Sequence, residues 1–149
     1  MRVLIATGLC MAATAGCGRA PEEPRVTVQH VAVTLPAIRG RPGAAYFTLR
    51  TNTNPTNLIG VTSPLVQRIE LHESGSKGGV SSMKPLEETV FPGRGVLAFQ
   101  PGGKHAMLFG IDPWVKAGGK IPLTFTFDPA PAVTVEAEVR GPGDVHDGH

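Results

Sequence analysis

The chain has 149 residues, a formal net charge of +2 and two cysteines. That length is enough for one domain and too short for two of ordinary size. The small and evenly spread charge gives no indication of nucleic-acid binding. With so few cysteines, a disulfide framework, a CxxC redox centre and a thiolate metal cluster are all excluded.

The N-terminal residues have the form of an export signal. Arg2 precedes a short apolar run and an Ala-Thr-Ala cleavage-type sequence, and the run falls short of the roughly 20 residues that span a bilayer. A Thr-Ala-Gly-Cys sequence ending at Cys17 resembles a bacterial lipobox, although Thr replaces the usual Leu. Either Cys17 is lipidated or the signal is cleaved without a lipid. We expect export to the periplasm or cell envelope, with a lipid anchor on Cys17.

This interpretation divides the chain into four parts. Residues 1–16 are the expected signal peptide, and the Pro-rich and charged residues 17–25 are a tether. Residues 26–141 form the expected domain, and residues 142–149 are a polar tail that contains histidines.

The pattern of the domain predicts an all-β fold. Short alternating runs are separated by many of the 19 glycines and 14 prolines. No segment has a sustained helical period, and residues 112–119 have room for one helical turn at most. The alternation changes phase at His30, which predicts a β-bulge. We predict seven to nine strands in a Greek-key β-sandwich, with clear strand patterns at residues 26–35, 44–51, 65–72, 95–100, 104–110, 121–128 and 132–140.

A histidine and a methionine in one predicted strand suggest a metal site. Residues i and i+2 of a strand point the same way, so His105 and Met107 share a face. An imidazole nitrogen and a thioether sulfur together favour Cu(I), whereas zinc prefers Cys, His or carboxylate ligands. Two ligands alone are a weak signal.

The other methionine outside the leader extends this pattern. Ten residues, including a Gly/Ser-rich stretch that we predict to be a loop, separate His72 from Met83, and twenty-one separate Met83 from His105. Taken singly, each residue has a simpler explanation. Met107 could fill a gap in the core, and His72 or His105 could be an ordinary surface residue. The joint spacing favours one site made of all four.

The spacing His-x10-Met-x21-His-x-Met resembles the ligand signature of periplasmic copper(I) chaperones of the PCu(A)C type. The surrounding segments IELHES, VSSMKPLEE and GGKHAMLFGIDPWVKAGGKIPLTFTFD are similar to that family too, and the resemblance covers about residues 26–140. Members often carry a further methionine just past the His-x-Met, where this chain has Leu108-Phe109-Gly110, and a bulkier aliphatic residue where it has Ala106. The resemblance implies a cupredoxin-like fold that binds Cu(I) through His72, Met83, His105 and Met107.

The resemblance also implies a function. The usual client is the dinuclear copper site of a respiratory cytochrome c oxidase, often loaded together with a thioredoxin-like assembly factor. We expect a monomer that carries copper. We do not expect an enzyme, because no base–nucleophile pair is visible in the sequence. A blue-copper electron carrier would need a Cys ligand. A periplasmic copper-buffering or resistance protein, and an interaction module whose His and Met are incidental, remain as alternatives.

Several further residues receive secondary predictions. Glu73 either orients a metal-bound histidine from the second coordination sphere or is an ordinary charged residue. His146 and His149 either capture additional copper or belong to an incidental polar tail. His30, Tyr46 and Trp114 are expected to be structural, with Trp114 closing a loop onto the sandwich.

Overall fold

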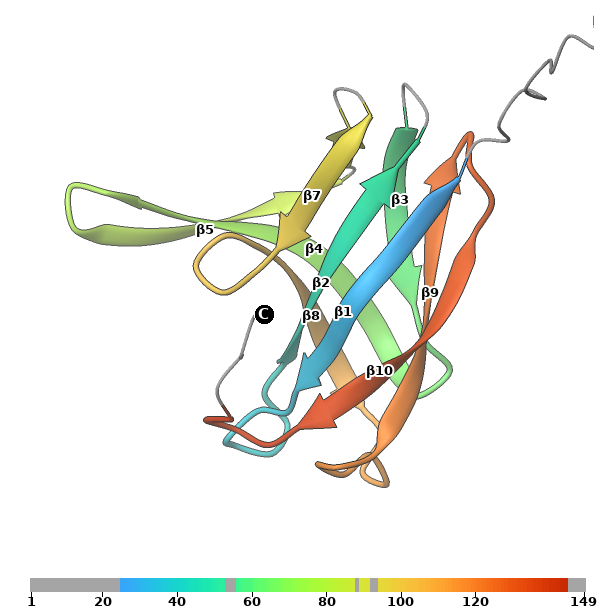
Figure 1. Ribbon diagram of the computed structural model, residues 1–149. Helices are drawn as coiled ribbons and strands as arrows, with labels where there is room; N and C mark the ends of the chain where they lie inside the picture. Colours follow the sequence, from blue (N-terminus) through green and yellow to red (C-terminus); the bar gives the residue numbers. More distant parts are fainter. Residues whose placement is uncertain (1–24, 53–55, 88, 92–93, 145–149) are drawn as a thin grey trace, which may run out of the picture.

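The computed structural model describes residues 25–52, 56–87, 89–91 and 94–144 (Figure 1). The predicted signal peptide, Cys17, His146 and His149 lie outside these residues. Ten strands occur within them, more than the seven to nine predicted: β1 Val26–Thr34, β2 Gly43–Thr51, β3 Thr56–Thr62, β4 Val66–Lys77, β5 Val80–Leu86, β6 Thr89–Phe91, β7 Gly95–Phe99, β8 Lys104–Ile111, β9 Lys120–Asp128 and β10 Val133–Arg140.

The strands form one hydrogen-bonded sheet in the order β5-β4-β8-β2-β1-β10-β9-β3-β6. β1 pairs with β10 in parallel, and the other neighbours along this order are antiparallel. β7 and β8 follow one another along the same edge of β2, because β8 pairs with its first residues and β7 with its last. Among the described residues no helix is long and apolar enough to cross a membrane.

The core lies on the inner face of this curved sheet. Phe47 stacks on Phe99 with ring centroids 4.4 Å apart, and it meets Phe125 edge-on at 4.8 Å. All three rings are fully buried, and burial of each contributes about 1.5–3 kcal/mol. The alternating pattern at residues 132–140 is confirmed, since Ala137 and Val139 are buried while Thr134, Glu136 and Glu138 are exposed.

The predicted bulge in the first strand is also confirmed. The pairing of β1 with β2 shifts register between Gln29 and Ala32, and His30 between them has a φ of 52°. A non-glycine residue at positive φ is uncommon and marks a place where the ladder is interrupted.

The segment between His72 and Met83 differs from its prediction. We predicted a loop, but β4 and β5 form a long hairpin that projects from the sheet (Figure 1). Its turn is Gly78-Gly79, with φ values of 61° and 78°, and two positive-φ residues make the tight turn that matches the twist of paired strands. Most residues of the hairpin beyond His72 are exposed, so neither face shows the apolar alternation that identifies a strand.

Candidate metal centre

The register of β4 and β8 brings the two predicted histidine ligands together. His72 and His105 are direct cross-strand partners, and their ring centroids lie 6.1 Å apart with 30° between the ring planes. Because a metal–nitrogen bond is about 2 Å long, nitrogens at the edges of two rings this close can reach one shared ion. Cross-strand partners on neighbouring strands project from the same face.

The two methionines lie on that face as well. Met107 lies two residues beyond His105 on β8 and pairs with Glu70. Met83 on β5 pairs with Ser74, two residues beyond His72 on β4. Since side chains on one strand share a face at intervals of two, all four predicted ligands lie on one face of three adjacent strands. His105 is buried, with 7% of its surface exposed, whereas Met83 is 51% exposed.

The hydrogen bond of His105 determines which of its two ring nitrogens can bind a metal. Its Nδ1 lies 3.0 Å from the carbonyl oxygen of Gly103. A carbonyl only accepts hydrogen bonds, so Nδ1 carries the hydrogen and donates it. In the neutral ring, Nε2 then has the free lone pair and is the atom that can bind a metal.

The other histidine contacts a carboxylate. Nε2 of His72 lies 3.0 Å from Oε2 of Glu70. Oε1 of the same carboxylate lies 2.8 Å from Nε of Arg68, whose guanidinium sits 4.5 Å above the ring of Phe109. Nδ1 of His72 is buried and has no hydrogen-bond partner among the described residues.

Of the two roles left open for Glu73, the structure shows a charged residue that contacts a lysine and not a histidine. It is the cross-strand partner of Lys104, and the two side chains form an ion pair. The Lys104 ammonium lowers the pKa of the Glu73 carboxyl below its usual value, first through the hydrogen bond and then through its charge. The carboxylate that contacts His72 belongs to Glu70, two residues before it, and the period of a strand was the signal that could have identified it.

The donor types on this face limit which metals fit. Within the part of the chain that the structure describes, no three His, Cys, Asp or Glu side chains form a cluster that could hold a metal. The thioethers of Met83 and Met107 are further donors on the face of the two histidines. Imidazole with thioether is a donor set that suits Cu(I).

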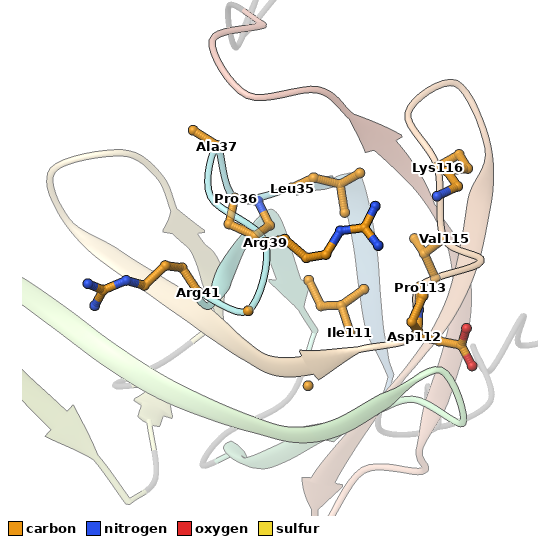
Figure 2. A pocket seen from close by; sticks show the side chains of 12 residues that line it. Leu35, Pro36, Ala37, Arg39, Arg41, Ile111, Asp112, Pro113, Val115 and Lys116 are labelled. Atoms are coloured by element: carbon orange, nitrogen blue, oxygen red, sulfur yellow. The ribbon is translucent and has the colours of Figure 1, made fainter.

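A cavity of about 340 Å³ lies elsewhere on the molecule, between residues 35–41 and 110–116 (Figure 2). Figure 2 shows Arg39 between Leu35 and Ile111, while Arg41 extends away from them. None of the predicted metal ligands lines this cavity. It lies at the Ile111 end of β8, whereas His105 is near the other end, so it is separate from the candidate metal centre.

Trp114 corrects another prediction. We expected it to close a loop onto the sandwich, but it is 86% exposed. Its backbone N–H donates a hydrogen bond to Oδ1 of Asp112 at 2.8 Å, which stabilises the turn without burying the indole.

Comparison with known proteins places residues 26–139 in the family described as "Putative lipoprotein LpqE-like". "Putative lipoprotein Lxx21020" of Leifsonia xyli subsp. xyli (strain CTCB07) is 30% identical over 91 residues, which are 60% of this chain and 55% of that protein. "Uncharacterized protein RP573" of Rickettsia prowazekii (strain Madrid E) is 31% identical over 87 residues, or 57% of this chain and 48% of that protein. The chain spans about half the length of these curated relatives.

Solved structures of other proteins have a similar fold. The copper-bound PCuAC domain from PmoF2 is 22% identical with a TM-score of 0.66, covering 78% of this chain and 93% of that one. The Cu(I) form of DR1885 from Deinococcus radiodurans is 31% identical with a TM-score of 0.57, covering 85% of this chain and 83% of that one. The predicted all-β, cupredoxin-like fold and the resemblance to the PCu(A)C type are confirmed. As ligands, the two histidines and two methionines stay predictions.

Proposed function

Because the chain belongs to the LpqE-like family, we propose that it is an exported Cu(I) carrier, held at the membrane by a lipid on Cys17. The observation that carries this proposal is the placement of His72, His105, Met83 and Met107 on one face of β5, β4 and β8. The name of the family supports the lipid anchor, and the Cu(I) form of the similar Deinococcus radiodurans protein supports the metal.

The chemistry of these donors suits a carrier. Two neutral imidazoles and two thioethers give Cu(I) soft ligands with no thiolate. Thioethers do not form disulfides in an oxidising compartment, where free thiols are readily lost. A site without a thiolate binds more weakly than a thiolate cage, and its half-exposed Met83 is accessible to an incoming ligand. Copper held in this way leaves by ligand exchange, so the protein transports the ion and does not catalyse a reaction.

We further propose that the client is the dinuclear copper site of a cytochrome c oxidase copper subunit, with a thioredoxin-like factor assisting. This client is what the resemblance to the PCu(A)C type implies. A copper-buffering protein would use the same site and differ only in having an efflux system as its partner, or none.

An anaerobic Cu(I) titration of the purified protein against a chromophoric competitor chelator tests the proposal. We expect a single Cu(I) per chain to be retained in competition. If the protein retains none, the alternative of a β-sheet interaction module with incidental His and Met replaces it. Mixing the loaded protein with the soluble copper domain of the oxidase subunit then separates the two copper functions. Transfer supports the chaperone, whereas retention by the carrier supports buffering.

A further inference from the structure

The contact between Glu70 and His72 has a consequence for how the metal would be held. We propose that Glu70 is a positioning residue that fixes His72 with its hydrogen on Nε2, so that Nδ1 is the atom His72 presents to Cu(I). This inference rests on the proposed function, because it concerns the ligands of the same site. It adds a residue outside the four-residue pattern.

The hydrogen-bond chemistry supports this tautomer. An ionised carboxylate only accepts hydrogen bonds, so the 3.0 Å contact between Glu70 Oε2 and His72 Nε2 places the hydrogen on Nε2. In the neutral ring the lone pair is then on Nδ1. That atom is buried and unpaired among the described residues, and buried polar atoms without a partner are rare enough to require an explanation. A metal ion would be its partner.

The carboxylate is itself held in place. Arg68 Nε donates to Glu70 Oε1 at 2.8 Å. The Arg68 guanidinium lies over Phe109, its cross-strand partner on β8, at 4.5 Å from the ring centroid. Glu70 is therefore oriented from one side by Arg68 and engages His72 on the other. Carboxylates that accept from the second nitrogen of a metal-bound imidazole fix the ring and raise its basicity as a ligand.

The two histidines would then bind Cu(I) through different ring nitrogens. His105 donates from Nδ1 to the Gly103 carbonyl and presents Nε2, whereas His72 donates from Nε2 to Glu70 and presents Nδ1. The negative charge of Glu70 would also lie next to an otherwise neutral donor set. We expect this charge to stabilise the bound cation.

The test begins with the metal-free full chain. Long-range ¹H–¹⁵N correlation spectra of its histidine rings at neutral pH should show His72 with its hydrogen on Nε2 and His105 with its hydrogen on Nδ1. On loading with Cu(I), which is diamagnetic, the His72 Nδ1 signal should move while its Nε2–H remains. A metal-free His72 with its hydrogen on Nδ1, or loss of the Nε2–H on loading with Cu(I), would overturn the inference.

Variants separate positioning from a general effect on the fold. Glu70→Ala removes the acceptor, and it should leave His72 exchanging between tautomers with about 10–100-fold weaker Cu(I) binding. Glu70→Gln keeps an acceptor oxygen without the charge, so it should restore the Nε2–H form and the part of the affinity that depends on positioning. Glu138→Ala is the matched control, because Glu138 also pairs with an arginine two residues away on its strand, at 3.6 Å from Arg140 Nη2.

The outcomes also separate this inference from the proposed function. If Glu70→Ala keeps a single Nε2–H tautomer and the parental affinity, Glu70 does not position His72 and the inference fails while the copper site stands. If the parent protein retains no Cu(I), the proposed function fails, and the assignment of His72 Nδ1 as a metal ligand fails with it. The tautomer of His72 in the metal-free protein is read in either case.

Discussion

Glu70 and Met107 lie directly opposite each other on β4 and β8, one step along the same face from the paired histidines. A carboxylate and a thioether thus flank the histidine pair from one side. Both oxygens of the carboxylate have partners, Arg68 and His72. The thioether of Met107 is therefore the donor from this row that can approach a soft metal, and the methionines become the first residues to test.

Met83→Leu and Met107→Leu should each weaken Cu(I) binding by at least about tenfold, or about 1.4 kcal/mol. Leucine conserves the volume, so the free energy of unfolding should change by less than about 1.5 kcal/mol, and least at the half-exposed Met83. Competitive Cu(I) titration and urea unfolding measure the two quantities. Parental affinity in both variants would contradict the site.

Replacing Gly79 by alanine should disturb the β4–β5 hairpin and leave the core intact. Gly79 has a φ of 78°, and an L side chain in that conformation costs roughly 1–2 kcal/mol. We expect faster amide hydrogen exchange in β5 and weaker Cu(I) binding, because Met83 lies on that strand. Gly95→Ala is the control, since a Cβ there would meet nothing within 4 Å and its φ is not in the left-handed region. Unchanged exchange in β5 would count against this account.

The tyrosine gives a direct measure of burial on β2, where it pairs with Ala32 of β1. Tyr46 is the chain's single tyrosine, and burial raises the pKa of its phenol above the usual value of 10.0. The folded-state pKa is higher than the unfolded one. The contribution of the neutral phenol to the free energy of unfolding is therefore fully present below the unfolded pKa and is lost as the pH rises through the folded pKa. An absorbance titration should give a midpoint above 10.0 that returns to the usual value in denaturant. Equal midpoints would contradict the burial.

The ion pair of Glu73 and Lys104 predicts the opposite dependence of stability on pH. The pKa of Glu73 is lowered from 4.5 by the hydrogen bond and charge of Lys104, so its stabilising effect is present above the unfolded pKa and is lost as the pH falls through the folded pKa. A ¹³C NMR titration of the carboxyl should show the lowered midpoint, and Lys104→Met should raise it. A midpoint that Lys104→Met leaves unchanged would mean that the pair does not form in solution.

The sequence predicted those parts of the site that depend on the period of a strand. His105 and Met107 belong to an apolar β8 pattern in which Ala106 and Leu108 are fully buried, so their shared outward face followed from the alternation. The hairpin around Met83 was missed because its polar residues are exposed on both faces, leaving only Gly78-Gly79 as a signal. The possible role of Glu73 in orienting a histidine was inferred because it follows His72 in the sequence. Neighbours on one sheet face, however, are two residues apart on a strand.

The projecting hairpin gives the candidate site a mechanical asymmetry. Three of its donors come from the part of the sheet where β4 and β8 pair beside the core. Met83 comes from β5, which among the described strands pairs with β4 alone. Segments with few buried contacts open at lower free energy than the core. The Met83 bond should therefore be the first to break and the last to form. An acceptor could take the vacated coordination position while three bonds still hold the ion, so copper would pass between proteins without ever being free in solution.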